Sequence, residues 1–127
     1  MAQHKVLVID DNPVVVRMNE SLLKSAGYEV IVARDGEEGL SAARTQQPAV
    51  ILLDLILPKM HGFEVCQRLK ADPQTAKIPV IVVTGTGLED VVRSEPELGV
   101  AGYLSKPYGL EELEAAIKKV VGFETEK

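Results

Sequence analysis

The sequence predicts a doubly wound α/β sandwich, in which helices cover both faces of a parallel β-sheet. Short apolar runs alternate with stretches of helical periodicity from one end of the chain to the other, and strand–helix alternation of this kind favours a parallel sheet. Three of the runs, in residues 6–9, 49–54 and 79–84, are apolar at consecutive positions. That pattern is typical of strands buried on both faces. A chain of 127 residues is long enough for one such domain.

The periodicity predicts five strands and five helices. The strands are expected at residues 6–9, 28–33, 49–54, 79–84 and 102–105, and the helices at 13–26, 36–46, 62–71, 89–94 and 110–121. Helix-boundary residues support these bounds, because Asn12 and Asp35 suit N-caps, Pro13 suits a first helical turn and Gly27 suits a helix stop. The tail, residues 122–127, is expected to fray.

Two helices have a predicted buried face. In the first helix, the spacing of Val15, Met18, Leu22 and Ala26 favours one apolar stripe. In the last helix, the stripe is Leu110, Leu113, Ile117 and Val120.

Composition excludes several classes of function. Acidic residues outnumber basic ones by 19 to 14, so we expect no direct nucleic-acid binding and no attraction to anionic lipid. The apolar runs are too short to cross a bilayer, and the N-terminus has no signal-peptide pattern. Cys66 is the only cysteine, so no internal disulfide can form. These features favour the cytoplasm.

Polar residues follow the predicted strands at their carboxyl ends. They are Asp10 and Asp11, Asp54, Thr84 and Lys106. In open α/β sheets the functional site lies at this edge of the sheet, so we expect these side chains to converge. Acidic residues after strands also serve as turn formers and helix caps, and this simpler interpretation applies most readily to Asp10 and Asp11 taken alone.

Three converging carboxylates indicate a cation site. Two unit charges about 4 Å apart repel by about 4 kcal/mol at an effective dielectric of about 20. Oxygen ligands without His or Cys favour a hard divalent ion, Mg²⁺ with Mn²⁺ as an alternative. One carboxylate could then attack phosphorus to give an acyl phosphate, with Lys106 offsetting charge on the transferring oxygens.

The chain resembles the receiver domain of bacterial two-component response regulators, the family of the chemotaxis regulator. The resemblance extends from Lys5 to Val121. It rests on four motifs in order: Val8-Ile9-Asp10-Asp11, Asp54 to Gly62 with Pro58 and Lys59, Pro79 to Gly85, and Tyr103-Leu104-Ser105-Lys106-Pro107. It implies a flavodoxin-like (βα)5 sandwich with strand order 2-1-3-4-5, and a single receiver domain over residues 1–127.

The resemblance also implies a role for each matching position. Asp54 corresponds to the phosphoacceptor, and Asp10, Asp11 and Asp54 with the backbone carbonyl of Ile56 correspond to the Mg²⁺ ligands. Thr84 and Tyr103 correspond to the coupled switch residues, Lys106 to the ion-pair partner and Pro107 to the turn that follows it.

The implied protein is a phosphorylation-activated signalling switch rather than an enzyme, although it assists its own phosphorylation and dephosphorylation. A histidine kinase or a histidine phosphotransfer protein would supply the phosphoryl group. The expected readers are a downstream protein or a fused output domain, contacted through the fourth helix, fifth strand and fifth helix, with phosphorylation-dependent homodimerisation as a further option. The sequence is compatible with a free-standing protein and with a fragment of a larger regulator.

The chain departs from the family pattern in two places. Ile56 and Thr86 occupy the positions two residues after Asp54 and Thr84, and neither side chain suits the orientation of an attacking water, so we expect slow self-dephosphorylation. Pro96 cannot donate a helical hydrogen bond, so we expect the fourth helix to end near Ser94, after the mobile segment 85–87.

Two other functions remain open: a small aspartyl-phosphate phosphatase and a phosphorylation-independent docking module. The phosphatase would commonly have a second acid where Ile56 lies. A nucleotide-binding module is disfavoured, because residues 10–13 replace the glycine-rich first turn.

Other conspicuous residues have structural interpretations. His4 and His61 are expected at the surface, Cys66 in the core with Phe63 and Leu69, and Tyr108 in simple packing. Glu111 and Glu112 suit a solvated helix start.

Overall fold

The computed structural model describes residues 4–54, 62–84, 100–106 and 108–121, with the side chains of Thr84 and Val121 excepted. Its sheet consists of the strands β1 (Lys5–Ile9), β2 (Glu29–Ala33), β3 (Val50–Asp54), β4 (Val80–Thr84) and β5 (Gly102–Ser105). All four pairings are parallel, and the strand order is β2-β1-β3-β4-β5. The fold class, the strand order and every strand are therefore as the sequence predicts, to within one residue at the strand ends.

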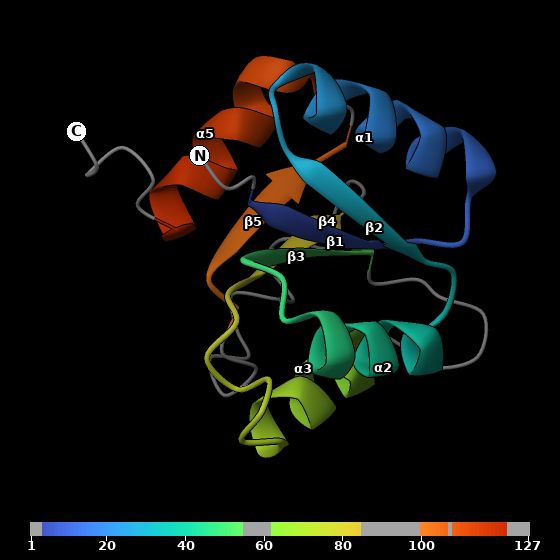
Figure 1. Cartoon of the computed structure of the whole chain (residues 1–127). Helices are drawn as coiled ribbons and strands as arrows, with labels where there is room; N and C mark the ends of the chain where they lie inside the picture. Colours follow the sequence, from blue (N-terminus) through green and yellow to red (C-terminus); the bar gives the residue numbers. More distant parts are fainter. Residues whose placement is uncertain (1–3, 55–61, 85–99, 107, 122–127) are drawn as a thin grey trace.

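Helices cover both faces of the sheet (Figure 1). The described helices are α1 (Pro13–Ser25), α2 (Gly36–Gln46), α3 (Gly62–Ala71) and α5 (Leu110–Val121). Helices α1 and α5 lie on one face, and α2 and α3 lie on the other. The predicted helix at 89–94, and with it Pro96 and residues 85–87, lies outside the described residues.

Alternate residues of the inner strands point to opposite faces and form two cores. Strand residues such as Leu7, Ile51 and Val82 pack with Cys66 and Leu69 of α3. Their neighbours in the chain, such as Val8 and Leu52, pack on the other side with residues of α1 and α5. The consecutive apolar runs of the sequence are explained by this burial on both faces.

Side-chain caps define where two helices begin. Asn12 Oδ1 accepts hydrogen bonds from the backbone N–H groups of Val14 (2.9 Å) and Val15 (3.3 Å). Asp35 accepts one from the N–H of Glu38 (2.9 Å). These bonds satisfy N–H groups that lack a partner within the helix. The predicted caps are confirmed, as is the stop after α1, where Gly27 has φ +94°, a conformation that glycine adopts without strain.

The predicted buried face of α1 is displaced by one position, since Leu22 and Ala26 of the predicted stripe pack against the core but are only partly buried. The buried residues are Val16, Asn19 and Leu23, whereas Met18 is 37% exposed. Apolar residues at 14–16 and 22–23 are compatible with two adjacent stripes along the helix. The stripe that is buried contains the polar Asn19, so hydrophobicity alone favoured the stripe beside it. In α5 the prediction holds, since Leu113 and Ile117 are fully buried.

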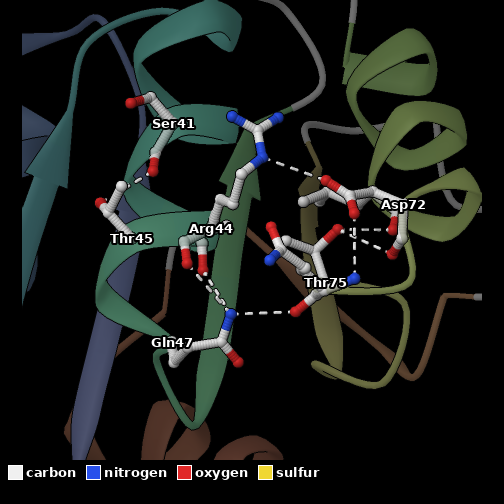
Figure 2. A network of polar contacts seen from close by, with 9 residues as sticks. Ser41, Arg44, Thr45, Gln47, Asp72 and Thr75 are labelled. Carbon is white, nitrogen blue, oxygen red and sulfur yellow. Dashed lines mark hydrogen bonds and ion pairs between the residues drawn. The ribbon is translucent and has the colours of Figure 1, made fainter.

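Polar contacts join the end of α2 to the segment after α3 (Figure 2). Arg44 Nε lies 3.1 Å from Asp72 Oδ2, and the side-chain amide of Gln47 donates to the carbonyl of Gln74 (2.9 Å). Gln47 itself has a left-handed φ of 49°, a conformation that is uncommon outside glycine. These contacts hold the two helices together on the face that carries them.

Candidate phosphoryl-transfer site

The register of the sheet brings Asp10 and Asp54 together. Strands β1 and β3 pair Ile9 with Leu53, so the residues that follow, Asp10 and Asp54, lie side by side at the carboxyl edge. The backbone N–H of Asp10 extends the ladder by donating to the carbonyl of Ala33 (3.1 Å). Asp11 lies beyond the strand and is exposed. The convergence that the sequence predicts for these three residues is confirmed.

The three carboxylates form a compact cluster of graded exposure. One oxygen from each of Asp10, Asp11 and Asp54 lies within 4.8 Å of the others. Asp10 is only 2% exposed, and the side chain of Asp54 is 12% exposed. Solvent can therefore reach the cluster from the side of Asp11 and Asp54, while Asp10 forms its floor.

Burial has a clear effect on the chemistry of Asp10. Desolvation of its carboxylate raises the pKa of Asp10 to about 6, and the nearby charge of Asp54 adds to the rise. The N–H of Asn12, which donates to Asp10 Oδ1 over 3.0 Å, and the charge of Lys106 act in the opposite direction. Near neutral pH, Asp10 loses its proton more readily when a cation compensates the cluster.

Lys106 supplies a positive charge from the β5 end of the sheet, two strands away from β3. It follows β5, and its Nζ lies 3.6 Å from Asp54 Oδ2. This distance fits an ion pair rather than a direct hydrogen bond. The lysine side chain is 34% exposed, so its ammonium lies at the mouth of the site and can contact a bound group as well as Asp54.

The donor set fits a hard divalent cation. Mg²⁺ binds oxygen at about 2.0–2.1 Å, so two oxygens on one ion lie at most about 4.2 Å apart. The spacing within 4.8 Å needs only a small adjustment to reach that geometry. The cluster contains neither sulfur nor imidazole ligands, which disfavours zinc and copper.

The remaining predicted site residues are placed only in part. Thr84 ends β4 and pairs with Ser105, the residue before Lys106, so its backbone lies at the same edge. Tyr103 is half-buried on β5 and packs against the core on the α2–α3 side. Ile56, Thr86 and Pro107 lie outside the described residues, as does His61, whereas His4 is exposed and Cys66 is buried as expected.

The sequence did not predict one buried polar contact close to the site. The Tyr108 hydroxyl donates to Asn19 Oδ1 over 2.6 Å, although packing alone was expected for Tyr108. Asn19 is 1% exposed and Tyr108 is 9% exposed. An Asn in phase with Val16 and Leu23 was the available signal, and the wrong phase assigned to α1 concealed it.

A parallel five-stranded sheet with an acidic cluster and a lysine at its carboxyl edge defines an α/β protein with a candidate cation site, and comparison with known proteins identifies the family. The model of the response regulator receiver domain matches residues 6–118. The chain belongs to this family. Receiver domains are the signalling switches of two-component response regulators rather than enzymes in the ordinary sense, and phosphorylation and Mg²⁺ binding are typical of them.

Individual relatives agree with this assignment. The chain is 41% identical over 118 residues to the DNA-binding dual master transcriptional regulator RpaA of Synechocystis sp., a match that covers 92% of this chain and 48% of RpaA. The chain thus spans about half the length of the curated relatives it matches. RpaA is described as DNA-binding. The expectation of no direct nucleic-acid binding is therefore not supported by this relative.

Solved structures share the fold. A putative response regulator from Chloroflexus aurantiacus is similar with a TM-score of 0.89 and 32% identity, over 95% of this chain and 99% of that one. The receiver domain of the sensor histidine kinase PA1611 from Pseudomonas aeruginosa, described with a magnesium ion coordinated in the active site cleft, has a TM-score of 0.87 and 29% identity, over 95% and 99% of the two chains. Within the part of this chain that the structure describes, no helix has the length and apolarity to cross a membrane.

Proposed function

We propose that Asp54 accepts a phosphoryl group from a phosphohistidine on a histidine kinase or a phosphotransfer protein. The observation that supports this most strongly is the cluster of three carboxylates with the Lys106 ammonium 3.6 Å from Asp54 Oδ2. Asp54 combines partial exposure with a neighbouring cation, which are the two properties that a nucleophilic carboxylate needs here. Asp10 is too deeply buried to meet a donor, and Asp11 is not paired with Lys106 in the described contacts.

In the transfer step, an oxygen of Asp54 forms a bond to phosphorus while the bond from phosphorus to the histidine nitrogen breaks. The imidazole leaves with that electron pair and takes up a proton. Lys106, which faces Asp54 before transfer, offsets negative charge on the phosphoryl oxygens after it. The Thr84 hydroxyl donates a hydrogen bond to one of these oxygens, and Tyr103 follows that movement.

Asp10, Asp11 and Asp54 would hold Mg²⁺, together with the backbone carbonyl of Ile56. When bound, Mg²⁺ offsets the charge of the carboxylates and of the transferring oxygens. The chain's own contribution is to supply the three carboxylates, to orient Asp54 through the β1–β3 register and to leave the mouth of the site open. The close spacing of the carboxylates and the raised pKa of Asp10, about 6, support this assignment.

The surface beside the site suits a protein donor. The exposed large hydrophobic residues among those described are Val14, 75% exposed, and Met18, 37% exposed. Both lie on α1, which begins three residues after Asp10, and they line a surface hollow together with Pro13, Arg17 and Ser21. An exposed apolar patch commonly marks a protein contact, and the phosphohistidine protein is the occupant proposed here.

Phosphorylation would act by shifting an equilibrium between two conformations, because a contact present only in the phosphorylated state favours that state. A contact worth about 1.4 kcal/mol shifts the populations tenfold. The output is a change in the face formed by the fourth helix, β5 and α5, with a downstream protein or a fused output domain as its reader. Ile56 would keep the phosphorylated state long-lived, and Ile56→Asn should then speed its decay.

The decisive experiment is incubation with Mg²⁺ and acetyl phosphate, followed by intact mass spectrometry of the wild type and of Asp54→Asn. The wild type should gain the mass of one phosphoryl group and the variant none. Asp11→Asn serves as a second variant, which should be slowed through loss of the cation yet still modified at Asp54. A wild type that stays unmodified, or an equal adduct on Asp54→Asn, would rule out the proposal.

A further inference from the structure

The buried hydrogen bond between Asn19 and Tyr108 lies next to the lysine of the site. Tyr108 is two residues after Lys106, in the connection from β5 to α5, and Asn19 is on α1. The side chains of Lys106 and Tyr108 also line one cavity of about 190 Å³ with Val15 and Met18 of α1. The Tyr108 hydroxyl therefore joins this connection to α1 close to the lysine.

The connection is held in two directions. Toward α5, the N–H of Gly109 donates to Glu112 Oε1 (2.9 Å), and the N–H of Leu113 donates to the carbonyl of Gly109 (3.1 Å). Toward α1, the Tyr108 hydroxyl reaches Asn19. Before the connection, Ser105 is fixed by its pairing with Thr84. Lys106 thus lies between a strand end and an anchored aromatic ring.

Stability alone does not explain this polar pair. A buried amide without a partner is costly, whereas replacing both partners by apolar groups of similar shape is often neutral or stabilising. The neighbours Val16 and Leu23 in the same stripe of α1 are apolar, so an apolar residue at position 19 would suit the site. A hydrogen bond differs from apolar packing in being directional, and it fixes the orientation of Tyr108 where packing would allow sliding.

The phenol keeps its role as donor over the working pH range. Burial raises the pKa of Tyr108 to about 12, and the charges of Asp10 and Asp54 add to the rise. The ring lines the same cavity as Lys106, so it lies close to the site.

We infer that the Asn19–Tyr108 hydrogen bond positions Lys106 against Asp54, which makes Tyr108 and Asn19 positioning residues for phosphoryl transfer. Neither side chain contacts the reacting atoms. The pair fixes the connection that carries Lys106 relative to α1. This restricts the orientations of the lysine, so its ammonium stays close to Asp54. This inference rests on the proposed phosphorylation of Asp54.

The test compares Tyr108→Phe, the double variant Asn19→Leu/Tyr108→Phe and the control Tyr28→Phe. Tyr28 is buried in the same apolar core as Tyr108, but it precedes β2 and so lies at the opposite edge of the sheet. Two properties are measured for each protein: the rate of modification by acetyl phosphate with Mg²⁺, and the NMR order parameter of the Lys106 backbone N–H.

Tyr108→Phe should slow modification by about tenfold, the scale on which small misplacements of reacting groups act. Its order parameter at Lys106 should fall from the rigid range, about 0.85, toward the flexible one, below about 0.6. The double variant should regain thermal stability, because it no longer contains the buried Asn19 carbonyl that would lack a donor. Its modification should nevertheless stay slow, and its Lys106 backbone N–H should stay mobile. Tyr28→Phe should match the wild type in both measurements.

A double variant that matches the wild type in modification rate and in the order parameter at Lys106 would overturn the inference, since the pair would then contribute packing alone. The double variant also provides the test if Tyr108→Phe fails to fold. The NMR measurement needs no phosphoryl donor. A wild type that takes up no phosphoryl group, while Tyr108→Phe loosens Lys106, would therefore refute the proposed function and leave the tether between α1 and the connection established.

Discussion

Lys106 Nζ and Asp54 Oδ2 lie 3.6 Å apart, although their strands are not neighbours. Strand β4 separates β3 from β5, and strands in a sheet are spaced about 4.8 Å apart. The long lysine side chain therefore crosses the end of β4, where Thr84 lies, to reach the carboxylate. A group attached to Asp54 Oδ2 would therefore lie beside the Lys106 ammonium.

Loss of this ammonium should slow phosphorylation. Lys106→Ala should reduce the rate of modification by acetyl phosphate about tenfold or more, because a positioned charge at the transferring oxygens is typically worth at least that. Lys118→Ala, which removes an exposed lysine from α5, is the matched control and should leave the rate unchanged. Equal rates for Lys106→Ala and the wild type would contradict the assigned role.

Asp10 should make the stability of the metal-free protein depend on pH. Its pKa is about 6 in the folded chain against an ordinary 3.8, so the folded state holds the proton more tightly than the unfolded state. The protonated Asp10 therefore stabilises the folded state fully below about pH 4, and this stabilisation is lost as the pH rises through about 6. Its size is about 3 kcal/mol, because each unit of pKa shift is worth about 1.36 kcal/mol.

Asp10→Asn, which cannot ionise, should therefore match the wild type near pH 4 and exceed its thermal stability above pH 6. Mg²⁺ should stabilise the wild type more at pH 7.5 than at pH 5, and should stabilise Asp10→Asn far less. Thermal unfolding with and without Mg²⁺ measures both effects. A wild type and Asp10→Asn that remain equally stable from pH 4 to pH 8 would show that Asp10 has an ordinary pKa.

Gly39 provides a test of the packing beneath the site. A methyl group on Gly39 of α2 would lie 2.5 Å from Ile9 Cδ1 and 2.9 Å from Ile9 Cγ1, and Ile9 directly precedes Asp10. Gly39→Ala should lower the free energy of unfolding by about 1–2 kcal/mol, because overpacking outweighs the gain in helix propensity. Ser41→Ala on the exposed side of α2 should change it by less than about 0.5 kcal/mol. Chemical denaturation gives both values, and a stabilised Gly39→Ala would be the contrary result.

The apolar surface of α1 should affect protein donors but not small ones. Met18→Gln, which keeps the size of the side chain and adds no charge, should slow transfer from a histidine kinase that phosphorylates the wild type by about tenfold, the cost of about 1.4 kcal/mol for a polar group at an apolar contact. Modification by acetyl phosphate should stay unchanged. Thr45→Gln, exposed on α2, is the matched control. Equal slowing with both donors would mean that Met18 acts on the site itself rather than on docking.

Much of this architecture is readable from sequence because local signals and topology agree. The run ending at Asp54, the caps Asn12 and Asp35, and the rule that parallel strands bring their carboxyl ends to one edge were sufficient to predict that Asp10, Asp54 and Lys106 meet. The strand order came from the family resemblance, since the apolar runs alone do not specify neighbours.

The phase of α1 could not be predicted from hydrophobicity, because the buried stripe contains Asn19. Its burial depends on Tyr108, 89 residues further along the chain, and no local pattern joins the two. The same limit applies to the raised pKa of Asp10, which follows from burial in the folded chain rather than from the residues beside it.

Strand β5 has only four residues and lies at the margin of the described sheet, with β4 as its neighbour. The site therefore needs residues from the first strand of the sheet and from the last described one, Asp10 after β1 and Lys106 after β5. A nascent chain that ended at residue 84 would already contain every acid of the cluster but no ammonium to compensate them. The site should accordingly be completed only after β5 has left the ribosome and docked beside β4.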